Sequence, residues 1–299
     1  CGGALSTRRS TGIDDDGRLV GRSRRVASMI DEVELRVGDC IGGLPTLSLI
    51  DINETTALQT RRDRKYLVTP EALFDVINAL SSAERVGVLE VGGRLVHQYR
   101  SVYFDTDDLL LYRMAATGRR RRFKVRRREY VDDAVQMLEV KTKDQRGRTV
   151  KARTTAAVTT SIAAPRHLSL DEAVFVADTL RDSGIWRHPP IEALGAVVST
   201  GYLRTTLAGQ AGGWRATIDQ QLVGARVDME AEPLGQCVVV ETKSAGAPTP
   251  LDRALWARGM RPQRVSKFAV AMAITQPGLA ANRWNRVLRD HLEWEPDVC

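Results

Sequence analysis

Alternation of apolar and polar residues is the main pattern along the middle of this chain. In the stretch RFKVRRREY, Phe123 and Val125 fall on one face of a β-strand. Lys124, Arg126 and Arg128 fall on the opposite face, about 6–7 Å apart, which is the two-residue repeat of a strand. A disordered basic tail would have no reason to place Phe and Val at alternate positions. The pattern therefore predicts a folded strand with one cationic face.

The same alternation recurs in five further segments, each of which gathers its charges on one face. The segments are 61–68, 138–143, 149–153, 214–219 and 238–243. One such segment is weak evidence, because any half-buried strand alternates. Six of them together are hard to dismiss, and they predict a sheet with one charged face.

Cations dominate that charged face. With Arg204 from a further expected strand, twelve cations stand against four anions. The cations are Arg61, Lys65, Lys124, Arg126, Arg128, Lys141, Lys143, Lys151, Arg153, Arg204, Arg215 and Lys243, and the anions are Asp63, Glu139, Asp219 and Glu241. If the strands close into a barrel with these charges inward, the interior is an electropositive tunnel that water or a ligand must fill. The few acids among so many bases suggest a bound metal ion.

Helix signals separate the strands. Thr69, Ser169, Thr249 and Ser266 each stand where a helix N-cap is expected, and a last amphipathic helix is expected over 282–294. The pattern has no βαβ rhythm, so we predict an α+β fold with an antiparallel sheet. We expect three parts, namely a largely disordered or appended N-terminal extension over 1–46, the folded domain over 47–275 and a C-terminal helix over 276–299.

The composition limits which partners and which cellular compartment are expected. A net charge of +7 and a pI near 9.5 indicate an anionic partner without identifying it. No apolar run reaches the roughly 18 residues that a transmembrane helix needs. The scattered cysteines Cys1, Cys40, Cys237 and Cys299 fit free thiols in a reducing compartment, so we expect a cytoplasmic protein. Cys1 indicates a truncated or processed start, with a lipidated terminus as the alternative, and nothing indicates the oligomeric state.

Common catalytic motifs are absent from the sequence. It contains no P-loop, no dinucleotide-binding glycine motif, no HExxH and no GxSxG. The histidines His97, His167, His188 and His291 are far apart, which favours structural or surface roles. The acidic run that begins at Asp105 lacks the glycine and glutamate of an EF-hand loop and is typical of a turn.

Eight short motifs, in order along the chain, resemble a known family. They are RxDxKY from Arg61, VYFDT from Val102, KVRRREY from Lys124, LEVK from Leu138, YxR from Tyr202, WRATID from Trp214, VETK from Val240 and VSKF from Val265. The series resembles the VTC domain, the polyphosphate-polymerase branch of the triphosphate tunnel metalloenzymes, also called the CYTH-like superfamily. No single motif is specific, but the ordered set is, and it covers residues 47–274.

This resemblance implies a fold and a site. The fold would be an antiparallel eight-stranded tunnel β-barrel with flanking helices, in which basic residues grip a triphosphate or polyphosphate. The phosphate binders of the family fall on Lys65, Arg126, Arg128, Lys141, Lys151, Arg204, Arg215 and Lys267. The metal ligand, for Mn²⁺ or Mg²⁺, falls on Glu241, with Glu139 as a second candidate. Asp63 stands where the family usually has glutamate, which puts a metal role for that strand in doubt.

Three function hypotheses follow. The first is a metal-dependent polyphosphate polymerase that transfers the γ-phosphoryl group of ATP onto a growing chain. The second is a hydrolase of tripolyphosphate or nucleoside triphosphates with water as the nucleophile; because no general base stands out, a phosphate nucleophile is favoured over water. The third is a non-catalytic module that binds polyphosphate or RNA, although an aromatic content of 5% offers few platforms for base stacking.

The expected partners are therefore ATP and tripolyphosphate or longer polyphosphate. Duplex nucleic acid is not expected, because at about 20 Å across it is too wide to enter a barrel of eight strands.

Overall fold

A computed structural model of the chain describes residues 38, 40–55, 62–83, 85–143, 149–156, 166–186, 189–210, 212–227 and 229–292. The chain divides into two compact units, Cys1–Gly43 and Leu44–Cys299, and all that follows concerns the second. The predicted N-terminal disorder, the side chain of Arg61 and the side chain of His188 lie outside the described residues.

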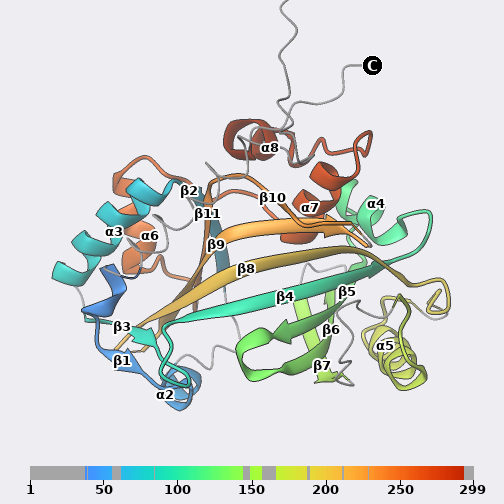
Figure 1. Ribbon diagram of the computed structural model, residues 1–299, viewed down its shortest axis with the longest axis horizontal. Coiled ribbons are helices and arrows are strands. Elements are labelled where there is room, and N and C mark those ends of the chain that lie inside the picture. The colour runs from blue at the N-terminus through green and yellow to red at the C-terminus, as the bar shows by residue number, and fades with distance from the viewer. Residues whose placement is uncertain are drawn as a thin grey trace, which may run out of the picture. The chain divides into compact units, whose positions relative to one another are not determined.

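One curled sheet forms the frame of this unit (Figure 1). Its main path runs β2 (Arg62–Val68), β11 (Val238–Ser244), β9 (Trp214–Arg226), β8 (Gly195–Gly209), β4 (Val96–Asp105), β5 (Arg122–Tyr130), β6 (Val135–Lys143) and β7 (Thr149–Thr155). Each neighbouring pair on this path is antiparallel. The predicted α+β fold with an antiparallel sheet is confirmed.

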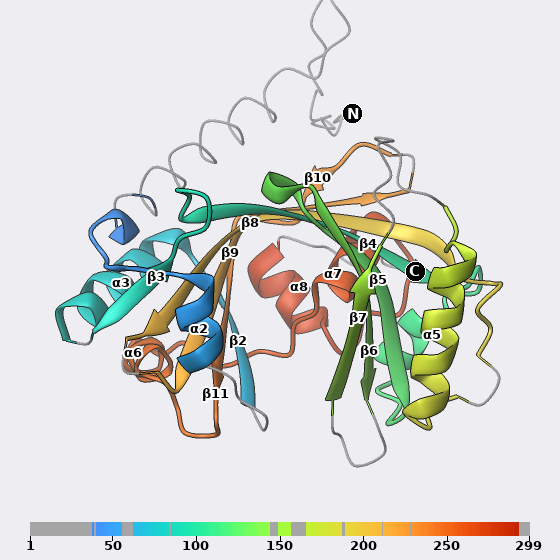
Figure 2. The same cartoon turned by 90° about the horizontal axis from the view of Figure 1, so that it is seen from below.

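Three short strands attach to this path. They are β3 (Val86–Leu89) on β8, β10 (Glu232–Pro233) on β9, and β1 (Thr46–Leu47), which pairs with β3 in parallel. Viewed from below, β4, β8 and β9 span the top of an arch whose two walls are β2 with β11 and β5 with β6 and β7 (Figure 2). Within the described strands, β2 and β7 are not paired with each other, so the sheet is a half-barrel that is open along one side.

Helices cover both faces of the sheet (Figure 2). On the outer side lie α3 (Pro70–Ala83), α5 (Leu170–Asp182) and α6 (Pro250–Ala257), and on the concave side lie α7 (Lys267–Thr275) and α8 (Asn285–Leu292). The remaining helices are α2 (Leu49–Thr55), α4 (Leu110–Ala116) and the 3₁₀ turn η1 (Val131–Asp133). None of the described helices is long and apolar enough to cross a membrane.

The expected helix starts are found in the structure. Ser169 and Thr249 form complete capping boxes with Glu172 and Asp252, and the Ser266 side chain accepts a hydrogen bond from the N–H of Ala269. These caps satisfy backbone N–H groups that have no partner within the helix. Thr69 likewise accepts a hydrogen bond from the N–H of Ala72 at 3.3 Å, directly before α3. All four helices therefore begin where the sequence pattern places them.

Asp105 is also a helix-capping residue. Its buried carboxylate accepts hydrogen bonds from the backbone N–H groups of Leu111 and Tyr112, at 2.7 and 2.8 Å, at the start of α4. Burial raises the pKa of Asp105 to about 6, even though these N–H groups favour the charged form. The acidic run therefore forms a turn, as expected.

On the outer face of β5, Arg127 forms a buried ion pair with a helix. Its Nε and Nη2 donate to the two carboxylate oxygens of Glu172 at 3.1 and 2.6 Å. Glu172 also closes the capping box of α5, so one carboxylate joins the strand to the helix. Phe123 and Val125 are buried beside it on the same face, as the alternation predicts.

On the outer face of β2, Arg64 forms an equivalent pair with Asp252 at 3.2 Å. Asp252 closes the capping box of α6 and accepts hydrogen bonds from the hydroxyl groups of Tyr66 and Thr242, both at 2.6 Å. Both walls of the arch are thus fastened to an outer helix by a carboxylate in its first turn.

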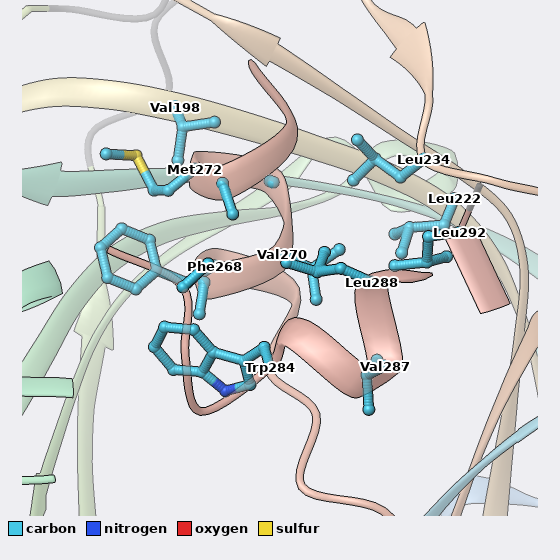
Figure 3. Close-up of a cluster of buried hydrophobic side chains, with 14 of the residues drawn as sticks. Val198, Leu222, Leu234, Phe268, Val270, Met272, Trp284, Val287, Leu288 and Leu292 are labelled. Atoms are coloured by element: carbon cyan, nitrogen blue, oxygen red, sulfur yellow. The ribbon is translucent and has the colours of Figure 1, made fainter. Parts of the chain in front are cut away.

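The concave face has an apolar part, which α7 and α8 fill (Figure 3). Phe268, Val270 and Met272 of α7 pack with Trp284 and with the side chains of Val198, Leu222, Leu234, Val287, Leu288 and Leu292. Because α7 is apolar on all sides, it is stable only when it is enclosed in this way. The predicted C-terminal helix belongs to this core, and the rest of the concave face is left to charged residues.

Candidate anion-binding site on the concave face

The charged part of the concave face contains the residues expected from alternation. Lys65 on β2 lies opposite Glu241 on β11, and Arg126 on β5 lies opposite Glu139 on β6. The two walls also act on each other across the arch. Desolvation and the ammonium group of Lys65 lower the pKa of Lys141, although β2 and β6 are far apart along the sheet path. The curl therefore brings both walls to one site.

Asp219 on β9 is the most tightly held carboxylate of the site. It is buried and receives hydrogen bonds from Arg204, whose Nε–Oδ1 and Nη2–Oδ2 distances are 2.5 and 2.8 Å, and from Lys267 at the start of α7. Burial alone would raise the pKa of Asp219, but Arg204 and Lys267 lower it far below the usual range. The carboxylate is thus permanently charged and fixes two cations at the junction of β8, β9 and α7.

Glu139 on β6 organises the opposite wall. It is buried, and its carboxylate accepts a hydrogen bond from the Nε of Arg126 at 2.6 Å and pairs with Lys151 on β7. Burial alone would raise the pKa of Glu139, but Arg126, Arg128 and Lys151 lower it to about 2. Both oxygens of this carboxylate are occupied by cations of the chain itself.

Glu241 on β11 is held more loosely than the other two carboxylates. Lys65 and Lys243 are its ion-pair partners, with N–O distances of 3.7 and 3.2 Å. Burial opposes the charged form, but the surrounding cations, Lys65 first among them, keep the pKa of Glu241 well below its usual value. The carboxylate oxygens of Glu241 are therefore in ion-pair contact rather than in tight hydrogen bonds. They remain available to a cation that arrives with a ligand.

The same geometry tests whether a divalent metal fits. Among the described residues, no three or more of His, Cys, Asp and Glu gather closely enough to hold a metal ion. Mg²⁺ in phosphate-handling sites often takes only one or two carboxylates and completes its shell with phosphate oxygens and water. Glu241 suits that role better than Glu139, because the Glu139 carboxylate is already engaged by Arg126 and Lys151.

Two cations of the site form no ion pair with a carboxylate among the described residues. The ammonium group of Lys124 donates to the hydroxyl group of Ser266 at 2.6 Å, and Arg128 donates to the hydroxyl group of Tyr202 at 2.9 Å. The Nε of Arg128 is buried and makes no hydrogen bond. A buried cation without an anion is unfavourable, so these groups favour an anionic ligand.

Tyrosine rings support the guanidinium groups, a feature that the sequence analysis did not assign. Tyr99 and Tyr202 are stacked at 5.5 Å, and Arg204 lies over both rings at 4.9 and 5.1 Å. Arg128 lies over Tyr99 at 5.4 Å. Tyr202 is two residues from Arg204, so alternation alone places them on the same face. No sequence signal marks Tyr99, because its contacts depend on how β4 pairs with β8.

The remaining predicted phosphate binder is Arg215 on β9. It lies opposite Lys243 in the β11–β9 register, near the start of β9. The predicted residues therefore share one concave face, and the arrangement can bind several negative charges along a line.

Comparison with known proteins finds a match to one protein family. A model of the VTC domain matches residues 60–276. Among solved structures, a putative adenylyl cyclase from Hippeastrum, HpAC1, described as having a dominant triphosphatase activity, is 17% identical; the match covers 72% of this chain and 97% of that one, with a TM-score of 0.43. The PH1819 protein of Pyrococcus horikoshii OT3 is 12% identical, with 70% and 97% covered and a TM-score of 0.39. No curated protein matches the chain.

Proposed function

Because this chain belongs to the VTC domain family, we propose that it transfers the γ-phosphoryl group of ATP onto a growing polyphosphate chain on its concave face. One observation carries the proposal beyond family membership. The cations on that face outnumber the carboxylates, and Lys124 and Arg128 form no ion pair with a carboxylate among the described residues. A linear polyanion would meet these charges together.

The residues of the chain would act mainly by positioning the phosphates and neutralising their charge. Phosphoryl transfer needs little covalent chemistry from the protein, and fixed cations aimed at the phosphate oxygens supply most of the stabilisation. Arg126 and Arg204 are held in place by Glu139 and Asp219, so their donors need no reorganisation when the ligand arrives. The other proposed phosphate contacts are Lys65, Arg128, Lys141, Lys151, Arg215 and Lys267.

The state of the carboxylates favours a phosphate nucleophile over water. A general base should have a pKa near the working pH. The pKa of Glu139 is lowered to about 2 and that of Asp219 is lowered further, so neither group accepts a proton readily from water. The terminal phosphate of a polyphosphate chain is already anionic and needs no base. The state of these two carboxylates therefore favours chain extension over hydrolysis.

A divalent metal would complete the site. We propose that Glu241 holds Mn²⁺ or Mg²⁺ together with the phosphate oxygens of the substrate, flanked by Lys65 and Lys243. When bound, the ion would supply further charge neutralisation and help to orient the phosphates.

The deciding experiment is incubation of purified protein with ATP and Mn²⁺ or Mg²⁺, with the products resolved on a gel that separates polyphosphate from free phosphate. We expect a ladder of polyphosphate. The matched variants are Arg128→Ala, which should abolish the ladder, and Arg181→Ala, which removes the same charge from an exposed position on α5 and should not. Release of free phosphate alone would identify a hydrolase. No turnover, with tight binding of tripolyphosphate, would identify a binding module.

A further inference from the structure

A second group of cations lies at one end of the sheet, beyond the site described above. Arg122 and Lys143 face each other where β5 begins and β6 ends. Arg264 comes from the segment between α6 and α7, and Arg283 from the segment between α7 and α8. Arg283 lies against Gly118, since a Cβ atom added there would overlap its guanidinium group. We call Arg122, Lys143, Arg264 and Arg283 the cationic rim.

The cationic rim differs from the central site in having no acidic partner among the residues that the structure describes. Each carboxylate of the central site holds two cations, as Asp219 does with Arg204 and Lys267. Among the described residues, no carboxylate forms an ion pair with a member of the rim. Desolvation and then the three other rim residues lower the pKa of Lys143, and all three are cations.

Four separate segments thus bring like charges together. The arrangement repels itself unless an anion or solvent screens it. A run of surface arginines on one strand would be an ordinary solvated face, but convergence from two strands and two loops indicates a surface shaped for an anion. Arg264 and Arg283 are exposed, so a ligand can reach them.

The cationic rim continues the line of charges in the central site. Arg122 is two residues from Lys124 on the same face of β5, and Lys143 is two residues from Lys141 on β6. Each step is about 6–7 Å along the strand. A triphosphate on the central residues therefore need not touch the rim, whereas a longer chain that leaves the site at this end would cross it.

We propose that the cationic rim is a second binding surface, which holds the part of a polyphosphate chain that extends beyond the triphosphate-sized central site. The proposal rests on the proposed function of that site and adds a preference for long chains. Attachment at two linked sites raises the apparent affinity without any change at the first site. Single-stranded RNA fits less well, because Trp284, the aromatic neighbour of Arg283, is buried in the apolar core and cannot stack on a base.

The test uses the double variant Arg264→Gln/Arg283→Gln, whose positions are exposed and whose new side chains keep most of the stem. Binding of tripolyphosphate and of long-chain polyphosphate is measured at several salt concentrations. We expect tripolyphosphate affinity to stay within about twofold of the parent. Long-chain affinity should fall, and the slope of log K against log salt should shrink by about 1.4, or roughly 0.7 for each removed cation. The control Arg181→Gln/Arg289→Gln removes the same charge from exposed helix positions and should change neither affinity.

The possible results separate the rim from the central site. Unchanged long-chain affinity in the rim variant, with tripolyphosphate still bound, overturns the rim alone. An equal loss for both ligands also overturns it, because the residues would then belong to the triphosphate site. A larger loss of single-stranded RNA binding than of polyphosphate binding would assign the surface to RNA instead. A parent protein that binds neither polyphosphate overturns both the rim and the proposed function.

Discussion

Three consecutive arginines on β5 show how the outer face of the sheet differs from the concave face. Arg127 points outward and pairs with Glu172, a buried carboxylate that also caps α5. Arg126 and Arg128 point inward, where Arg126 shares Glu139 with Lys151. Arg128 donates to the hydroxyl group of Tyr202 and forms no ion pair with a carboxylate among the described residues. The same residue type thus stabilises the fold on one face and is available to a ligand on the other, and strand alternation alone decides which.

The two faces should respond differently to the loss of a charge. On the outer face, cation and carboxylate are matched one to one, so removal of either leaves a buried charge without a partner. On the concave face, cations are in excess, so removal of one that has no ion pair relieves the repulsion between cations in the ligand-free protein. Stability and ligand binding are therefore expected to depend on different arginines.

The largest expected effect is on stability, from Arg127→Ala. The free energy of unfolding should fall by about 3–5 kcal/mol, because Glu172 would remain charged and buried. Urea denaturation measures it. The double variant Arg127→Met/Glu172→Gln should recover most of the loss, since it removes both charges and keeps a side chain that can close the capping box. A greater loss of stability in Arg128→Ala than in Arg127→Ala would refute the comparison.

The next effect is on turnover, from Arg128→Ala. Removal of one prearranged donor should lower the rate by about 10²–10³-fold. Stability should stay within about 1 kcal/mol of the parent, because Arg128 has no carboxylate partner among the described residues. The polyphosphate gel and urea denaturation give the two readouts. Full activity with lost stability would place Arg128 among the structural arginines.

A smaller effect, on the metal dependence of turnover, should distinguish Glu241 from Glu139 on the concave face. Glu241→Gln should weaken the Mn²⁺ dependence of turnover by at least about tenfold while tripolyphosphate still binds, because the amide keeps the size but loses the charge. Glu139→Gln should leave the metal dependence unchanged, because Arg126 and Lys151 occupy that carboxylate. Metal titrations of both variants check this. Equal titration curves for Glu241→Gln and the parent would remove Glu241 as a ligand.

The smallest effect is on the pH dependence of binding. Burial lowers the pKa of Lys243 to about 8, against the favourable charge of Glu241. Without ligand, the folded state releases this proton near pH 8 and the unfolded state near pH 10.5, so the contribution of Lys243 to stability rises with pH between those values. A bound polyanion favours the charged form, so its affinity should fall by up to about tenfold per pH unit in that window.

Titration calorimetry at pH 8.5–9 in two buffers of different ionisation enthalpy measures the proton uptake directly. Lys243→Met should abolish part of the uptake. Binding without any proton uptake in the parent would contradict the lowered pKa.

Much of the site could be predicted from the sequence because strand alternation is strictly periodic. It placed Lys65, Arg126 and Glu241 on one face without knowledge of any contact, and the N-cap residues located four helices. The ion pairs of the outer face could not be predicted in this way. Arg127 and Glu172 are 45 residues apart in sequence, and the partner of a buried arginine depends on which helix packs over it.

The filling of the concave face by α7 was also beyond the pattern. An all-apolar helix must be enclosed, but its sequence does not identify the surface that encloses it. The opening between β2 and β7 was likewise not foreseen, since closure of a barrel depends on strand tilt and register rather than on composition.

That open side has a consequence for solubility. The exposed edge of a sheet is a template on which another chain can add a strand, and proteins protect such edges with covering segments or inward-pointing charges. The edge of β2 is partly covered, because the backbone N–H of Gln263 donates to the carbonyl oxygen of Lys65 at 2.7 Å. On β7, Lys151 and Arg153 point inward beside the edge. Cations that suit the site for a polyanion thus also discourage the edge-to-edge pairing that begins aggregation.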